Sequence, residues 1–177
     1  MPKRIENLRD TILTTARAQL LETGYQDFAM REAARRCGVA VGTLYNYFPS
    51  KDALAAAVML EDWHEDLDAM KAGCAGAAGP MAALALLYDG VARYYRRYRS
   101  VWASYSFGGS QQPEYARRHR LLIRQLAAIL APKLAAVPGL PSATDLFLAE
   151  NILTCAGSSE VPFSTFAALA ASFLGTN

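Results

Sequence analysis

The sequence has few of the residues that mark disulfide-bonded or metal-binding proteins. Its 177 residues include three cysteines and two histidines. Cys37, Cys74 and Cys155 are odd in number and far apart, which fits neither a disulfide framework nor the paired spacing of a zinc site. We therefore expect buried apolar thiols, with a redox switch as the alternative. No metal site and no cofactor are expected.

Long hydrophobic runs are also lacking. No apolar run approaches the roughly 18–20 residues that cross a membrane, and the N-terminus MPKRIENLRD has no apolar block typical of a signal peptide. With 53% hydrophobic and 19% charged residues, the composition is that of a globular protein with a sizeable core. We expect a cytoplasmic protein without a membrane partner.

Neither sign of charge dominates the chain, but the charges are unevenly distributed along it. The net charge is +2, made up of +3 in residues 1–51, −5 in residues 52–72 and +4 in residues 73–177. A basic end followed by an acidic helix could steer one end of the molecule towards a polyanion. By itself this pattern indicates no particular partner.

The alternation typical of β-strands is missing, and helical periodicity replaces it. Apolar residues step by three or four along most of the chain, with glycines and prolines at the breaks. We expect Ser50 to cap a helix and Pro80 to begin one. The chain is predicted to be all-α with about nine helices, over residues 5–24, 30–37, 41–48, 51–72, 80–107 with an interruption near Ser100 and an end at Gly108 and Gly109, 113–130, 142–158 and 162–175.

One short predicted helix carries side chains suited to contact with another molecule. It lies in GVAVGTLYNYF, residues 38–48. At about 100° per residue, Val41, Leu44 and Phe48 share one face, and the opposite side is polar and aromatic. Two turns of helix are not stable alone, so this face must be supported from behind. Three helices with a tight CGVA turn predict a helix-turn-helix unit.

The same residues resemble the tetracycline-repressor (TetR) family. The resemblance covers residues 5–54 through LLETGY, REAARRCGV and GTLYNYFPSKDAL. It implies a DNA-binding domain over residues 1–50 and a helical domain for effector binding and dimerisation over residues 51–177. The second domain shows no alignable motif, so its resemblance is architectural.

The resemblance also assigns residues to DNA. Asn46 is the candidate for reading a base edge, and Tyr47 and Lys51 for phosphate contacts. Arg31 in the second helix is expected to reach either a phosphate or a guanine. For Tyr45 and Tyr47, packing against the first helix is the alternative. The full set expected to face DNA is Arg31, Gly42, Thr43, Tyr45, Asn46, Tyr47 and Lys51.

Two positions depart from the family pattern. Relatives often carry Thr or Ser at the position of Ala29 and Ser at that of Ala40, where a hydroxyl caps a helix and contacts phosphate. Alanine at an N-cap costs a helix about 1 kcal/mol and removes a phosphate ligand. DNA binding is therefore expected either to be intrinsically weak or to rely on other cations, namely Lys3, Arg4, Arg31 and Lys51.

The expected effector-binding region is rich in aromatic residues. Its stripe is either core or the lining of a pocket for an aromatic or amphipathic small molecule. The exposed arginines are expected to be solvated, with an anionic effector as the sharper alternative. The candidate pocket residues are Tyr88, Tyr95, Tyr98, Trp102 and Tyr105.

The last two predicted helices are apolar and carry little charge. By resemblance they form a four-helix bundle across a two-fold axis in a homodimer. The dimer would place two recognition helices about one turn of DNA apart on a palindromic operator. The candidate interface residues are Leu146, Leu153, Ala156, Phe166, Ala170 and Phe173.

We therefore expect a ligand-responsive transcriptional repressor that binds double-stranded DNA, and not an enzyme. A helical enzyme or carrier is the first alternative, although the only metal-like grouping is His64 among Glu61, Glu65 and Asp68. A ligand-buffering or protein-binding relative that has lost specific DNA binding is the second alternative, and Ala29 and Ala40 favour it.

Overall fold

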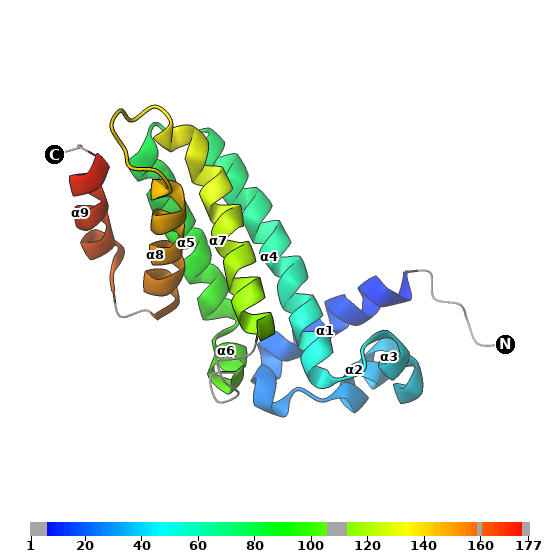
Figure 1. Ribbon diagram of the computed structural model, residues 1–177. Coiled ribbons are helices and arrows are strands. Elements are labelled where there is room, and N and C mark those ends of the chain that lie inside the picture. Colours follow the sequence, from blue (N-terminus) through cyan, green and yellow to red (C-terminus); the bar gives the residue numbers. More distant parts are fainter. Residues whose placement is uncertain (1–6, 106–112, 159–160, 175–177) are drawn as a thin grey trace. The chain divides into compact units, whose positions relative to one another are not determined.

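A computed structural model describes residues 7–105, 113–158 and 161–174 (Figure 1). Within these ranges the regular structure is helical and includes no strand, which confirms the all-α prediction. The helices are α1 (Leu8–Asp27), α2 (Met30–Cys37), α3 (Val41–Tyr47), α4 (Lys51–Ala75), α5 (Pro80–Arg97), α6 (Arg99–Tyr105), α7 (Pro113–Leu134), α8 (Thr144–Ser158) and α9 (Phe163–Leu174).

The chain divides into two compact units whose boundary lies within α4. The first unit contains residues 1–64 and 98–108, and the second contains residues 65–97 and 109–177. The sequence-based division at residue 50 follows the helix-turn-helix motif alone. The compact unit that holds this motif also includes the first half of α4 and, from much later in the chain, α6.

The first unit is built on apolar residues that α1 presents every three or four positions. Ile12, Ala16 and Leu20 are buried there. Alanines and larger aliphatic residues of the next three helices complete the core. The alanines allow the helices to approach closely. The buried partners are Ala33 and Ala34 of α2, Leu44 of α3, and Leu54, Ala55 and Val58 of α4.

Glycines set two helix ends in this unit. Gly38 has a φ of 68° and closes α2, with its N–H bonded to the Arg35 carbonyl and that of Val39 to the Ala34 carbonyl. This pair of bonds is a Schellman motif. Gly24, where the sequence predicts the end of the first helix, has a φ of 74°, and one further helical turn follows it. The regular helix therefore breaks where expected, although α1 continues to Asp27.

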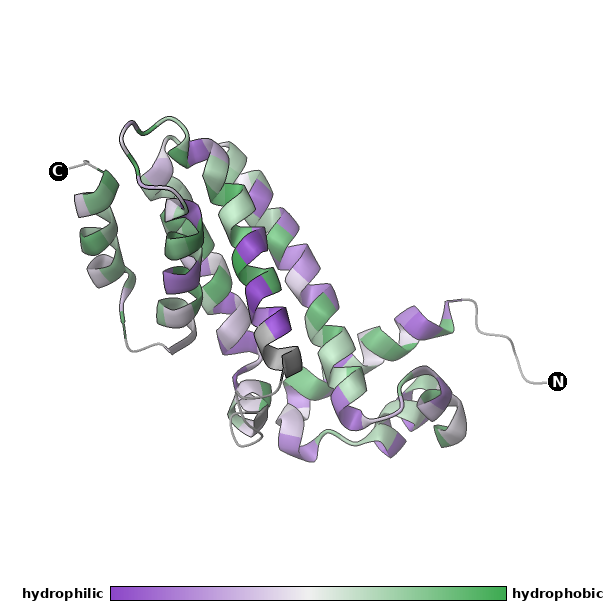
Figure 2. Ribbon diagram, viewed as in Figure 1, coloured by the Kyte–Doolittle hydropathy of each residue, from purple (hydrophilic) through white to green (hydrophobic). Residues whose placement is uncertain are grey.

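The second unit is a bundle of α5, α7, α8 and α9 with the last part of α4. Its core leucines include Leu84, Leu87, Leu126 and Leu130, and Ile152 is fully buried. Figure 2 shows hydrophilic and hydrophobic residues interleaved along α7, whereas α9 is mostly hydrophobic. Among the described helices, none is long and apolar enough to cross a membrane.

Several predicted helix boundaries are confirmed in both units. The Ser50 hydroxyl accepts a hydrogen bond of 3.0 Å from the Ala53 N–H, so Ser50 caps α4. Pro80 is the first residue of α5, where a missing N–H costs nothing. The predicted interruption near Ser100 falls at Tyr98, between α5 and α6.

Candidate nucleic-acid interface and effector site

The α3 helix presents one anchored face and one exposed face. Leu44 is fully buried and Phe48, just after the helix, is 6% exposed. On the other side, Tyr45 is 47% and Tyr47 46% exposed, and Asn46 is exposed. Because half of each tyrosine is in water, neither ring is needed to fill the core. The anchors therefore hold a polar and aromatic surface towards solvent.

The start of α3 leaves room and donors for a ligand. Gly42 is exposed, and a methyl group added there would meet no atom within 4 Å. Ala40 is the N-cap residue, as expected, and makes no side-chain capping bond, and the same is true of Ala29 at α2. The first N–H groups of both helices therefore lack a side-chain acceptor from the cap residue. Thr43 is half-buried beside them.

Two cations, Arg31 and Lys51, were expected near this face, and they differ in exposure and in their partners. Arg31 is exposed at the start of α2 and forms no ion pair or hydrogen bond with another described residue. Lys51 is half-buried, donates a hydrogen bond of 3.0 Å to the Gln26 carbonyl and lies 4.5 Å from the Tyr25 ring centroid. An ammonium has three donors, so Lys51 retains capacity for a phosphate.

A cluster of charges on α2 was not singled out from the sequence. Glu32 accepts hydrogen bonds of 2.7 Å from Arg35 and 2.8 Å from Arg36, and Arg36 also pairs with Glu22 at 2.7 Å. The Arg35 bonds, followed by that of Arg36, lower the pKa of Glu32 from 4.5 to about 2. The spacings of three and four residues are the signal that could have predicted it. The cluster occupies two arginines that would otherwise be available to DNA.

A buried polar joint connects three helices of the first unit. The Tyr98 hydroxyl, fully buried before α6, donates a hydrogen bond of 2.6 Å to Asp62 of α4. Arg17 of α1 lies 2.5 Å from the other oxygen of the Asp62 carboxylate. On the neighbouring turn, Gln26 donates to the Ser104 hydroxyl at 2.8 Å. These bonds fix α6 against α1 and α4.

The aromatic residues expected to line one pocket fall into both units. In the second unit, the Tyr88 hydroxyl donates to the Val161 carbonyl, its ring centroid lies 5.2 Å from that of Phe163, and burial raises its pKa. Tyr95 is half-buried against Gly157. Tyr98 belongs to the joint described above, and Trp102 is half-buried in the first unit. The side chain of Tyr105 lies outside the described residues.

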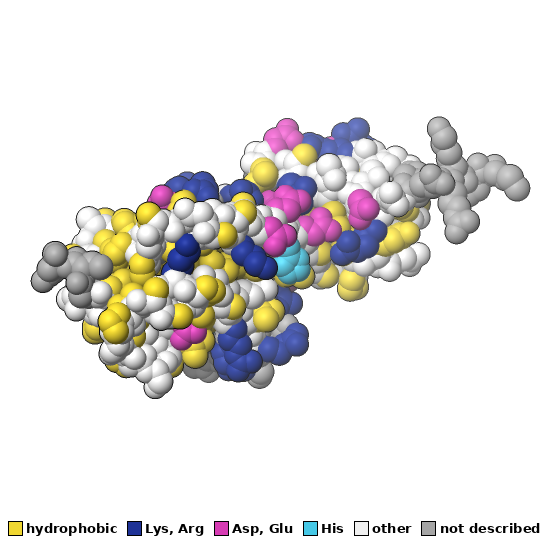
Figure 3. All heavy atoms as spheres, turned by 90° about the horizontal axis from the view of Figure 1, so that it is seen from above, with side chains coloured by type: hydrophobic (Ala, Val, Ile, Leu, Met, Phe, Trp, Pro, Cys, Tyr) yellow, Lys and Arg dark blue, Asp and Glu magenta, His cyan; other side chains and the backbone are white. Residues whose placement is uncertain are grey.

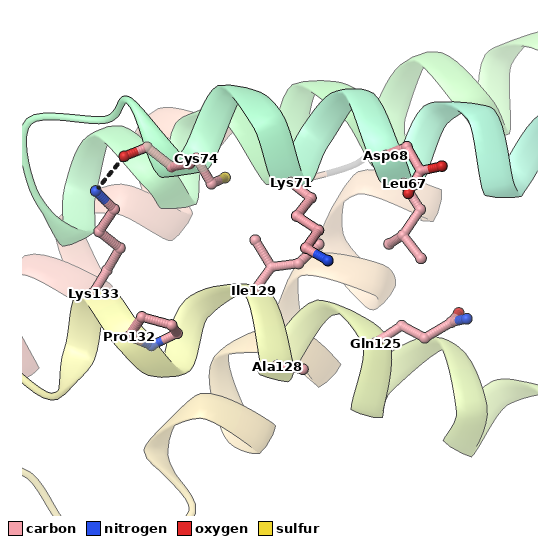
Figure 4. Close-up of a pocket in the computed structure, with 10 residues that line it drawn as sticks. Leu67, Asp68, Lys71, Cys74, Gln125, Ala128, Ile129, Pro132 and Lys133 are labelled. Atoms are coloured by element: carbon pink, nitrogen blue, oxygen red, sulfur yellow. Dashed lines mark hydrogen bonds between the residues drawn. The ribbon is translucent and has the colours of Figure 1, made fainter.

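The second unit contains a groove of about 590 Å³ between α4 and α7. Figure 4 shows Lys71 reaching from α4 towards Ile129 on α7. None of the predicted aromatic pocket residues with described side chains lines this groove. The lining residues are Leu67, Asp68, Lys71, Cys74, Ala75, Gln125, Ala128, Ile129, Pro132 and Lys133.

Of the six residues expected at a dimer interface, four are buried and two are exposed. Leu153, Ala156, Phe166 and Ala170 are buried inside the second unit, where they pack α8 and α9 onto its core. The two that remain in water are Leu146 at 41% and Phe173 at 56% exposure. Sequence reasoning missed two further exposed apolar side chains on α8 and α9, Phe147 and Leu169.

These four exposed residues, Leu146, Phe147, Leu169 and Phe173, form the α8–α9 apolar surface. The ring centroids of Phe147 and Phe173 lie 5.9 Å apart, so the two helices contribute to one patch. Figure 3 shows hydrophobic side chains gathered at the end that carries α9, where few charges interrupt them. Exposed apolar patches of this kind mark interaction surfaces.

Comparison with known proteins places the helix-turn-helix in a family. Residues 12–58 match the family described as "Bacterial regulatory proteins, tetR family". The HTH-type transcriptional regulator UidR of Escherichia coli (strain K12) is 36% identical over 62 residues, which are 35% of this chain and 32% of that protein. The HTH-type transcriptional repressor KstR of Mycolicibacterium smegmatis is 41% identical over 71 residues, which are 40% of this chain and 34% of that protein. The matched segment thus spans about a third of these relatives.

The fold has a structural relative over almost its whole length. The transcriptional regulator FadR from Bacillus subtilis, solved in complex with stearoyl-CoA, covers 94% of this chain and 96% of its own, with a TM-score of 0.55 and 19% identity. At this identity the likeness shows the fold alone. All three of these proteins are described as transcriptional regulators or repressors.

Proposed function

Because the chain belongs, through its N-terminal segment, to the TetR family, we propose that it is a ligand-responsive transcriptional repressor. In this proposal it binds a palindromic operator as a dimer and is released by a small-molecule effector. The observation that carries the proposal is α3, whose buried Leu44 and Phe48 hold a solvent-facing set of polar and aromatic side chains. A helix of this kind fits the major groove.

The exposed residues of α3 suit distinct roles on DNA. Asn46 has a donor and an acceptor and would read a base edge, as amides do with adenine. The Tyr45 and Thr43 side chains would contact bases or sugars beside it, and Gly42 would permit close approach. Tyr47, Lys51 and Arg31 would bind phosphates and set the register.

The α8–α9 apolar surface supports the dimer. Its four large side chains are between 41% and 62% exposed in the single chain. Burying them in a second copy would remove apolar area from water, which is the main favourable term in association. A two-fold axis through this surface would present the two α3 helices to half-sites about 34 Å apart.

Release by an effector requires two states of the dimer. An effector can shift the equilibrium only by its difference in affinity for the DNA-binding and the released state. The structural relative FadR was solved with stearoyl-CoA, which supports a small-molecule effector for a protein of this fold. The repressor named KstR among the relatives supports repression as the direction of control.

The test is fluorescence anisotropy with labelled DNA from the region flanking the gene, titrated at several salt concentrations. Asn46→Ala together with Tyr45→Ala should reduce the preference for the specific site by tenfold or more, since base contacts contribute about 1–3 kcal/mol each. Arg31→Ala should weaken binding to all sequences and lower the salt slope by about one.

Arg124→Ala on α7 is the matched control, because it removes an exposed arginine from the other unit. It should leave DNA affinity and the salt slope unchanged. Binding without sequence preference, unaffected by the α3 variants, would contradict the proposed function. That outcome would instead favour a ligand-binding relative without specific DNA binding, a candidate supported by the uncapped starts of α2 and α3.

A further inference from the structure

The groove between α4 and α7 combines an apolar lining with two cations, Lys71 and Lys133. Six of its ten lining residues are apolar, and its volume of about 590 Å³ lies within the range of roughly 300–1,000 Å³ typical of small-molecule sites. Lys71 is exposed in it and forms no hydrogen bond or ion pair with another described residue. Figure 4 shows this side chain lying across the groove above Ile129.

One end of the groove is closed by Lys133. Its ammonium donates hydrogen bonds of 3.1 Å to the Ala75 carbonyl and 2.8 Å to the Ala77 carbonyl, at the end of α4. Ala75 is the last residue of α4, so its carbonyl is one that a helix end leaves without an intrahelical partner. Ala77 lies in the connection just after the helix. The bonds use two of three ammonium donors, so one remains for a ligand. The neighbouring Pro132 has no N–H and contributes an apolar wall.

The charge in the groove favours a singly charged anion. Lys71 and Lys133 contribute two positive charges and Asp68 one negative charge, which leaves a net charge of +1 among the lining residues. Cys74 adds no charge, because burial raises the pKa of its thiol, which donates to the Ala83 carbonyl at 3.6 Å. The remaining wall, with Leu67 and Ile129, offers nothing polar to a ligand's tail.

We propose that this groove binds an amphipathic carboxylate. The carboxylate lies between Lys71 and Lys133, and the aliphatic tail lies along Leu67 and Ile129. Its role as the effector rests on the proposed function, whereas its binding does not. The aromatic stripe of α5 and α6 is not part of this site, since none of its described members lines the groove.

The experiment is isothermal titration calorimetry of the full chain, without DNA, against four probes that each contain a ten-carbon chain. Decanoate should bind. Decanol, which is neutral, should bind at least fivefold more weakly, and decyltrimethylammonium should not bind in the groove. The affinity for decyl phosphate, the fourth probe, should not exceed that for decanoate by more than about fivefold, because the lining holds only one net positive charge.

Three variants locate the binding site. Lys71→Gln should weaken decanoate binding by about fivefold and leave decanol unchanged, as expected for one partly exposed ion pair. Ala128→Trp places a large ring in the groove from an exposed position and should abolish binding of both. Arg124→Gln, which removes an exposed cation of α7 outside the groove, is the matched control and should change neither affinity. Circular dichroism checks that each variant keeps its helices.

Equal affinity for all the probes would overturn the proposal, and so would decanoate binding that neither Lys71→Gln nor Ala128→Trp reduces. Since no DNA is present, failure of the proposed repressor function leaves these outcomes unaffected. If decanoate binds in the groove but does not release DNA, the site stands and its role as the effector site fails.

Discussion

Removing the Tyr98 hydroxyl should destabilise the first unit measurably. The hydroxyl is fully buried and donates a 2.6 Å hydrogen bond to Asp62, which is 3% exposed. A hydrogen bond to a charged group contributes about 1.5–3 kcal/mol. Arg17 still pairs with the carboxylate in Tyr98→Phe, so we expect the lower half of that range, about 2 kcal/mol. The phenyl ring keeps the packing, so no cavity term adds to this cost.

The assay is thermal unfolding followed by circular dichroism at fixed protein concentration, because a dimer's Tm depends on concentration. In a chain of this size, 1 kcal/mol corresponds to about 2–4 °C, so Tyr98→Phe should lower Tm by about 4–8 °C. Tyr45→Phe, the same change at an exposed tyrosine of the same unit, should shift Tm by less than 1 °C by the same scale. Combining Tyr98→Phe with Asp62→Asn should give less than the sum of the two effects, since the residues share one bond. A loss below 1 °C for Tyr98→Phe, or strict additivity, would refute this account of the joint.

Three further predictions concern other parts of the chain. Gly90→Ala should lower the free energy of unfolding, measured by urea denaturation, by about 1–3 kcal/mol, because the added methyl group would overlap Sδ and Cγ of buried Met70. The loss is expected even though alanine is the better helix former. An unchanged denaturation midpoint would show that Met70 moves aside freely. The carboxyl ¹³C signal of Glu32 should titrate near pH 2 in the folded protein and near 4.5 in Arg35→Ala with Arg36→Ala. A folded-state pKa below the unfolded value stabilises the protein above pH 4.5, and that contribution is lost as the pH falls towards 2; a wild-type midpoint near 4.5 would mean that the arginines do not hold the carboxylate. Ala40→Ser should raise the stability of the chain by about 1 kcal/mol and tighten DNA binding at low salt, since its hydroxyl would cap α3; a loss of DNA affinity would contradict the role assigned to the bare cap.

The helices of both units could be read from the sequence because local rules decide them. Apolar residues at spacings of three and four predicted α2 to the residue, and Gly38, Ser50 and Pro80 marked ends through conformational or capping preferences. Gly24 shows the limit of such rules. Its positive φ was predictable, whereas the extra turn to Asp27 is accompanied by the bond between the Tyr25 N–H and the Ser100 hydroxyl, a contact across 75 residues.

The α3 surface was predictable for the same reason, and the interiors of the two units were not. The period of a helix alone places Leu44 opposite Asn46. No period separates an aromatic residue that lines a cavity from one that fills a core, and Tyr88 and Tyr98 both took interior positions with specific hydroxyl partners. The groove between α4 and α7 depends on residues 50 to 66 positions apart in sequence, and no local pattern joins them.

The composition of the first unit bears on how an effector signal would reach DNA. Seven residues of α3 do not form a stable helix alone, so the position of Asn46 depends on the core beneath it. The first unit also includes α6, although α6 follows α5 in the sequence and α5 belongs to the second unit. Within the described residues, the backbone joins the units at two places, inside α4 between His64 and Glu65, and again between Arg97 and Tyr98. Tyr98 directly follows the second of these junctions, and its hydroxyl donates to Asp62. Asp62 in turn lies two residues before His64, where the first junction occurs. In the proposed mechanism, a ligand that displaces either junction would therefore strain the same buried bond, and through the core the orientation of α3.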